Sequence, residues 1–142
     1  GHHPGHICLM SDAGLVAGDM VAGIGTILIP PGTGDMTVYI EQLERLKAMN
    51  PHLIFPSHGP VIAMPQHLIQ HYIDHRKARH ERVAAALKDG LQGLEEIAVA
   101  AYADSPDAHP GLAVDQTLSH LVALEREGRV EKHADGWRME RD

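Results

Sequence analysis

The sequence predicts an α+β fold, and three observations lead to that class. The first sixty residues contain short apolar runs bounded by turn residues, two longer segments carry apolar residues at helical spacing, and a tight-turn pair lies near the end of the chain. We expect three parts: residues 1–63 with strands and one helix, residues 64–90 as a long connecting helix, and residues 91–142 as a smaller lobe.

The first part reads as strand, strand, loop, helix and strand. Its apolar segments with the length and boundaries of strands are Ile7–Met10, Leu15–Met20 and Leu53–Phe55. A loop rich in glycine and proline separates the second strand from a helix that Asp35 or Thr37 can cap. Pro51 ends that helix because proline cannot continue the hydrogen-bond ladder. We expect Tyr39 to pack its ring in the core with its hydroxyl near the surface.

A long helix is predicted from Pro65 to Gly90, where glycine is a plausible C-cap. Its apolar stripe consists of Ile69, Tyr72, Ile73, Val83 and Leu87. The smaller lobe then has three expected elements: a helix over Leu91–Ala103, a helix over Val114–Gly128, and a hairpin over Arg129–Arg141 around Asp135-Gly136. We expect Trp137 to be a core anchor of this lobe. Helix, helix and hairpin is the order expected at the end of a winged-helix lobe.

Composition limits the function classes. The 142 residues carry a formal charge of −7, which argues against broad binding to nucleic acid or to anionic membranes. Cys8 is the only cysteine, so no internal disulfide can form and a reducing, cytoplasmic location is expected. No apolar run approaches the roughly 20 residues of a membrane span. Histidine is enriched: the 12 histidines equal lysine and arginine together, and imidazole is a common metal ligand.

Three short motifs place possible metal ligands beside strand ends. They are Gly1-His2-His3-Pro4-Gly5-His6, Ala17-Gly18-Asp19 and Pro56-Ser57-His58-Gly59-Pro60. A carboxylate between imidazoles suits zinc, iron or manganese, and the two oxygens of Asp19 could bridge two ions roughly 3.5–4 Å apart. His67, His71 and His75 also follow one another at helical spacing, but they fall opposite the apolar stripe and are predicted to be a solvated face.

These motifs in this order resemble the C-terminal half of the metallo-β-lactamase superfamily, and within it the group of β-lactamase-like protein 2. The stretches GLVAGDM, LERLKAMNPHLIFPSHGPVI and YIDHRKAR look like that group. The resemblance implies that His2 binds a first metal, that Asp19 bridges both ions and is the catalytic carboxylate, and that His58 binds the second. His6 matches a structural neighbour of the metal site. His3 replaces the usual Ser or Thr, and could donate a hydrogen bond in its place or compete for metal.

The superfamily motif H-x-H-x-D-H does not occur in the sequence. The resemblance therefore implies the C-terminal half of an αββα sandwich, followed by the long helix and the winged-helix lobe, with the other ligands on a missing N-terminal half. One face of the sheet would then be exposed. We expect the chain, which would be a fragment, to keep that missing half as a partner or to form a homodimer.

Arg76 falls in the apolar stripe of the long helix and needs a partner there. It could brace the helix against the metal lobe or point toward an anionic substrate.

The expected function is that of a metal-dependent hydrolase. The resemblance implies two divalent ions, zinc first and manganese or iron as alternatives, and a metal-bound hydroxide that attacks an ester, thioester or phosphodiester. The substrate would be a small ester or thioester, or RNA, and the chain would be inactive without its N-terminal half. The alternative is a non-catalytic binding or regulatory module built on the winged-helix lobe. DNA is disfavoured because the second helix of that lobe offers one arginine, Arg126.

Overall fold

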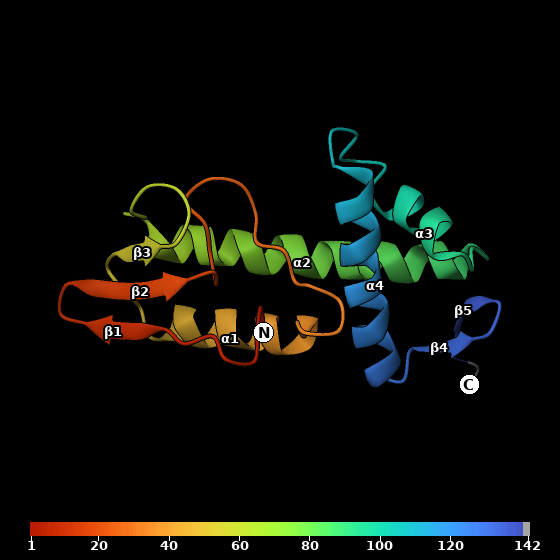
Figure 1. Ribbon diagram of the computed structural model, residues 1–142, viewed down its shortest axis with the longest axis horizontal. Helices are drawn as coiled ribbons and strands as arrows, with labels where there is room; N and C mark the ends of the chain where they lie inside the picture. Colours follow the sequence, from red (N-terminus) through yellow and green to blue (C-terminus); the bar gives the residue numbers. More distant parts are fainter. Residues whose placement is uncertain (141–142) are drawn as a thin grey trace. The chain divides into compact units, whose positions relative to one another are not determined.

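The computed structural model of the chain describes residues 1–140 and confirms the α+β class (Figure 1). Its elements in chain order are β1 (Leu9–Ser11), β2 (Gly14–Gly18), α1 (Met36–Ala48), β3 (Ile54–Pro56), α2 (Pro65–Lys88), α3 (Leu94–Ala101), α4 (Pro110–Arg126), β4 (Val130–His133) and β5 (Gly136–Met139). The predicted long helix is therefore present, two residues shorter at its C-terminal end.

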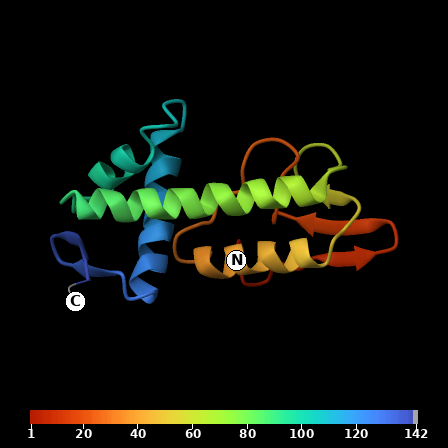
Figure 2. The ribbon, with the colours of Figure 1, turned by 180° about the vertical axis from the view of Figure 1, so that it is seen from behind.

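Two compact units divide the chain within α2. The first unit holds residues 1–29 and 33–76, and the second holds residues 30–32 and the described residues from Lys77 onward. Both views show α2 as one uninterrupted helix (Figure 1 and Figure 2). Each unit therefore takes half of the same helix. The expected division at residues 63 and 90 stays a prediction.

The sheet of the first unit has the order β1-β2-β3. β1 and β2 form an antiparallel hairpin in which Ser11 pairs with Gly14, so the connecting loop is two residues long. β2 and β3 are parallel, and α1 lies in the crossover between them. The two parallel strands consequently end at the same edge of the sheet. All three strands begin one or two residues away from the predicted positions, which is the usual uncertainty of strand ends.

One face of this sheet is buried and the other is not. Leu15, Ala17 and Ile54 are at most 1% exposed and form part of the core. On the opposite face, Leu9 pairs with Val16, and Val16 pairs with Phe55, so these three side chains form a row across the strands. Leu9 is 60% exposed, Val16 is 48% exposed and Phe55 is half-buried. We call Leu9, Val16 and Phe55 the apolar row. An exposed sheet face is what the sequence analysis predicted.

Helix α1 covers the buried face. Asp35, rather than Thr37, is its N-cap, and the Asp35 carboxylate accepts a hydrogen bond from the Val38 amide at 3.0 Å. The predicted apolar stripe is buried through Met36, Tyr39, Leu43 and Leu46. The expectation for the Tyr39 hydroxyl was wrong, because the whole side chain is buried and its hydroxyl donates to the Met20 carbonyl at 2.7 Å.

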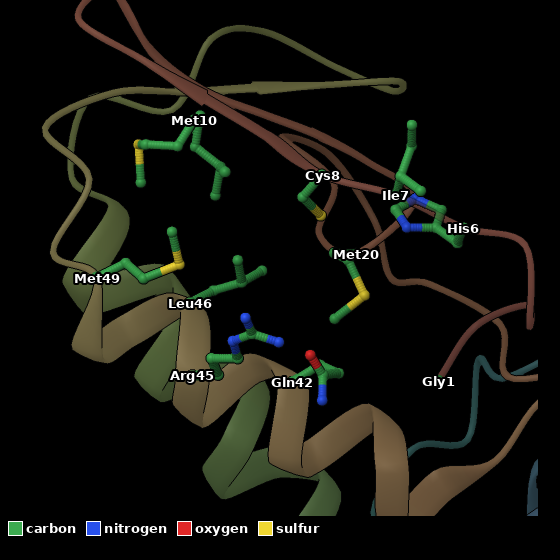
Figure 3. Close-up of a pocket in the computed structure, with 11 residues that line it drawn as sticks. Gly1, His6, Ile7, Cys8, Met10, Met20, Gln42, Arg45, Leu46 and Met49 are labelled. Atoms are coloured by element: carbon green, nitrogen blue, oxygen red, sulfur yellow. The ribbon is translucent and has the colours of Figure 1, made fainter.

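A hollow of about 290 Å³ lies between the first two strands and α1 (Figure 3). Cys8, Met10 and Met20 approach it from the strand side, and Arg45 and Met49 approach it from the helix. Met10, which lies in β1, forms part of its wall, and β1 is an edge strand of the sheet. The edge of the first unit is therefore incompletely packed at this place.

The second unit has its own apolar core, contributed by α2, α3, α4 and the hairpin. Its buried members are Val83, Ala84, Ala86, Leu87, Ile97, Ala101, Leu121, Leu124, Val130 and Trp137. Trp137 is thus the core anchor that was predicted. The hairpin turn lies one residue earlier than predicted, at Ala134-Asp135, because His133 pairs with Gly136. The order helix, helix, hairpin agrees with the prediction, and the winged-helix arrangement stays a prediction.

Arg76 and Arg79 are both buried, but they serve different units. Arg76 donates to Thr26 and to the Ile27 carbonyl in the first unit. Arg79 donates to the Ala101 carbonyl and to the Asp104 carboxylate in the second. The hydrogen bond from Arg79 is the main reason that the pKa of Asp104 lies below its usual value. Buried guanidinium groups of this kind need such partners to offset desolvation.

Within residues 1–140, none of the helices combines the length and the apolar character that crossing a bilayer requires.

The core of the second unit can be tested with two leucines on α4. Leu121→Ala should lower the free energy of unfolding by about 2–5 kcal/mol, because it leaves a cavity at a side chain with no exposed surface. Leu112→Ala is the matched control, since Leu112 lies on the same helix and is 50% exposed, and its cost should stay below about 1 kcal/mol. Urea unfolding followed by circular dichroism measures both; equal losses would contradict the assigned core.

Candidate metal centre

Asp19 follows β2, and a close-fitting turn sets its position. Gly18 has a φ of 52°, and a Cβ at this residue would lie 2.5 Å from the His6 ring. The Asp19 amide donates to His6 Nε2 at 2.9 Å, and the Gly18 carbonyl accepts from the Ser57 amide at 3.1 Å. Only glycine has both the freedom at positive φ and the small size that this turn requires.

His58 follows β3, the parallel neighbour of β2, and therefore lies at the same sheet edge as Asp19. Its Nε2 atom is 3.3 Å from Asp19 Oδ1, and its side chain is 70% exposed. The His58 carbonyl accepts a hydrogen bond from the Gly23 amide at 2.8 Å. Gly59 follows at a φ of 83° against the backbone of residues 23–24, which leaves no room for a Cβ. Two loops are thus packed backbone to backbone beside Asp19.

His2 approaches the other oxygen of the same carboxylate. His2 Nε2 is 3.8 Å from Asp19 Oδ2. His2 Nδ1 lies 2.7 Å from the Leu28 carbonyl, and because a carbonyl can only accept, Nδ1 carries the proton. In the neutral ring this leaves the lone pair of Nε2 for a ligand on the side of Asp19. A backbone partner that fixes the tautomer in this way is typical of metal-binding histidines.

His6 and His3 are placed differently. His6 accepts the Asp19 amide hydrogen bond, so its Nε2 atom is occupied, and its ring meets that of His2 edge-on at 6.2 Å. Burial, the largest cause, lowers the pKa of His6, which favours the neutral form that can accept. His3 is exposed, and its Nδ1 accepts from the Gly5 amide at 3.1 Å. His6 supports Asp19 and His3 stabilises the preceding turn.

Arg76 is only 2% exposed, and two of its partners belong to the loop that follows Asp19. Its guanidinium also lies 5.6 Å from the centre of the Tyr39 ring. These contacts support the bracing interpretation of Arg76 rather than contact with a substrate. His67, His71 and His75 are exposed, as the solvated-face interpretation predicts.

Asp19, His2 and His58 offer oxygen and nitrogen donors that suit divalent metal ions, but they supply only part of a coordination shell. Asp19 Oδ1 is buried and accepts no hydrogen bond from the part of the chain that the structure describes. Each oxygen of Asp19 faces a different imidazole. Among residues 1–140, no three His, Cys, Asp or Glu side chains converge closely enough to hold a metal ion. Asp19, His2 and His58 could therefore act as metal ligands only together with further ligands.

Tyr72 is the contributor that the sequence analysis missed. Its hydroxyl accepts from the Ala22 amide at 3.1 Å and donates to the Gly25 carbonyl at 3.2 Å. Two signals pointed to it: a tyrosine in an apolar stripe needs a partner for its hydroxyl, and a glycine-rich loop needs partners for its backbone.

The chain is similar to several known proteins over most of its length. It is 33% identical to a β-lactamase-like protein 2 homolog of Drosophila melanogaster, over 94% of this chain and 48% of that protein. It is 31% identical to an atrochrysone carboxyl ACP thioesterase of Aspergillus fumigatus, over 63% of this chain and 28% of that protein. The crystal structure of a β-lactamase domain protein from Burkholderia ambifaria matches 98% of this chain with a TM-score of 0.83 and 27% identity.

This chain belongs to the metallo-β-lactamase superfamily. No family model matches it. The chain spans less than half the length of the curated relatives it matches, and 45% of the Burkholderia ambifaria chain. The metallo-β-lactamase fold is thus represented here in part. The resemblance inferred from the three motifs is confirmed.

The turn before Asp19 can be tested with two glycines of positive φ. Gly25→Ala should cost about 1–2 kcal/mol of stability, because only backbone strain opposes it: a Cβ there meets nothing within 4 Å. Gly18→Ala carries the same strain and also a Cβ against the His6 ring, so it should cost more and displace His6. Urea unfolding and the His6 ring resonances report the difference; equal costs with an unmoved His6 would contradict the close packing.

Proposed function

We propose that this chain supplies one side of the metal centre of a metallo-β-lactamase-fold hydrolase. In this proposal Asp19 would be a ligand shared by two divalent ions, His2 would be a ligand of the first and His58 a ligand of the second. One observation carries it: two imidazole nitrogens face the two oxygens of a single carboxylate, and one of these oxygens is buried without a hydrogen bond. Zinc fits the nitrogen and oxygen donors best, with manganese or iron as alternatives.

Different residues of the chain orient different parts of the proposed metal centre. His6 and the turn at Gly18 fix the backbone of Asp19, so the carboxylate points toward His2 and His58. The Leu28 carbonyl holds the His2 ring in one tautomer and orientation. Divalent ions bound there would supply a nucleophilic water at neutral pH and would neutralise charge on a developing oxyanion. The exposed side of His58 leaves room for a substrate to approach.

We propose an acyl ester or thioester as the substrate class. The similarity to a protein named as an ACP thioesterase supports this choice. A phosphodiester such as RNA is the second candidate, and the net charge of −7 speaks against it because phosphate contacts favour a basic surface.

We further propose that the metal centre is completed by a segment that packs on the apolar row. Leu9 and Val16 expose large apolar surface, and Ile7 beside them is 73% exposed. The relatives that this chain matches are about twice its length or longer. An N-terminal half of the same protein would cover the row and bring the remaining ligands. In its absence a second copy would cover the row.

Metal binding tests the site directly. Zinc should bind the longest native polypeptide that contains this chain, and Asp19→Asn or His58→Gln should weaken that binding by roughly tenfold or more, because each removes a ligand. His52→Gln is the matched control, since His52 is exposed and lies six residues from His58 on the other side of β3. Isothermal titration measures the affinities. Equal effects of His52→Gln and His58→Gln would show that zinc binds the histidine-rich surface without a site.

Activity distinguishes the hydrolase from the alternative regulatory module. In the longest native polypeptide that contains this chain, a chelator should abolish release of thiol from an acyl thioester, and zinc or manganese should restore it. A regulatory module would be indifferent to both treatments.

The apolar row is tested by association state. The chain alone should sediment as a dimer, or with a second polypeptide attached, because an exposed apolar sheet face favours association. Leu9→Lys with Val16→Lys should convert it to a species of 15.4 kDa. Ile24→Lys is the control, because Ile24 is 74% exposed but lies in the loop after β2. A wild-type monomer in sedimentation velocity would contradict the proposal.

A further inference from the structure

One loop connects the three side chains of the metal centre. The loop Met20–Leu28 begins directly after Asp19. In its middle, the Gly23 amide donates to the His58 carbonyl at 2.8 Å, and at its end the Leu28 carbonyl accepts from His2 Nδ1 at 2.7 Å. The positions of His58 and His2 relative to Asp19 therefore depend on the path of this loop.

The loop contains no helix or strand, and side chains from two helices hold it instead. These anchors are the Tyr39 hydroxyl on the Met20 carbonyl, the Tyr72 hydroxyl on Ala22 and Gly25, and the Arg76 guanidinium on Thr26 and the Ile27 carbonyl. Tyr39, Tyr72 and Arg76 are all at most 5% exposed. Buried hydrogen bonds of this kind are costly to lose, because the partner is left desolvated.

The anchors act on different stretches of the loop. Tyr72 binds one residue before Gly23 and two residues after it, so it fixes the stretch that carries the hydrogen bond to His58. Arg76 binds immediately before Leu28, which carries the hydrogen bond to His2. The first stretch ends at Gly25, whose carbonyl Tyr72 holds, and the second begins at Thr26, which Arg76 holds. Gly25 has a φ of 80° and open space around it, so the backbone has more conformational freedom at this junction than another residue would give it.

We infer that Tyr72 and Arg76 are separate positioning residues for the two ends of the metal centre, Tyr72 for His58 and Arg76 for His2. Neither touches a ligand atom of the centre; each acts through the backbone of the loop. The consequence for metal affinity rests on the proposed function. The positioning itself is a property of the metal-free chain and can be measured there.

Two conservative variants separate the two ends. Tyr72→Phe removes only the hydroxyl and should raise the exchange rate of the Gly23 amide hydrogen about tenfold, while His2 keeps its proton on Nδ1. Arg76→Lys replaces the planar guanidinium, whose Nη2 atom contacts both Thr26 and Ile27, with an ammonium group on a shorter side chain. It should leave Gly23 protected and shift His2 toward a mixture of tautomers. Amide exchange and the ¹⁵N shifts of the imidazole rings, measured at pH 8 where the ordinary imidazole is neutral, report both effects.

Matched controls come from the second unit. Tyr102→Phe removes a tyrosine hydroxyl there, and Arg79→Lys changes the other buried arginine of α2. Neither should affect Gly23 exchange or the His2 tautomer. Should Arg76→Lys fail to fold, Thr26→Val removes one acceptor of the Arg76 guanidinium from the loop side and should shift the His2 tautomer in the same direction.

Zinc titration of the same variants, made in the longest native polypeptide that contains this chain, links positioning to function. Each variant should lower zinc affinity about tenfold, as loss of a group that orients a metal ligand does. If each variant changed both the Gly23 exchange rate and the His2 tautomer, the inference would be overturned, because the loop would be loosened as a whole. If neither variant changed either property, it would also be overturned, because Tyr72 and Arg76 would then have no positioning role. If the two ends respond separately but zinc binds neither wild type nor variants, the positioning stands and the proposed function falls.

Discussion

The backbone of the loop Met20–Leu28 has to be satisfied without a helix or strand of its own, and much of the first unit is arranged around that requirement. Backbone amides and carbonyls that are buried need partners. Here those partners are the hydroxyls of Tyr39 and Tyr72, the guanidinium of Arg76 and the backbone beside His58. The same loop ends at Leu28, whose carbonyl is the hydrogen-bond partner of His2. The contacts that satisfy the loop backbone therefore also position the metal-facing side chains.

The parallel pairing of β2 with β3 provides the second part of that arrangement. Parallel strands end at one edge of a sheet, so the residues that follow them, Asp19 and His58, meet there without any direct sequence relation. This much could be predicted, since each motif follows an apolar run and loops at strand ends converge. The capping role of Asp35 and the core position of Trp137 were predictable for similar local reasons.

Other features could not be read from the sequence, and the reasons are physical. Periodicity places Tyr39 and Tyr72 on apolar stripes, but it does not say which loop the hydroxyls will meet, because that depends on tertiary packing. Arg76 required a partner, and the sequence left open whether a loop or a substrate would supply it. Leu9 belongs to an apolar run that predicts a strand, and the run does not show that Leu9 is 60% exposed. An apolar pattern in the sequence predicts that a face is to be buried, but it does not say which segment or partner buries it.

The apolar row and the metal centre belong to the same three strands, and this links covering the face to completing the centre. Val16 lies in β2, three residues before Asp19, and Phe55 lies in β3, three residues before His58. At about 3.3 Å per strand residue, each apolar side chain is at most about 10 Å from the metal-facing residue that follows its strand. A polypeptide segment that buries the row therefore arrives beside Asp19 and His58 as well. Burial of the row would provide the free energy that holds such a segment in place, and the segment's own polar groups would be free to serve as ligands. An exposed apolar row without a metal centre would only make the chain associate with other apolar surfaces. The row and the centre lie on the same pair of parallel strands, which is an argument that one partner segment both buries the row and supplies the missing ligands.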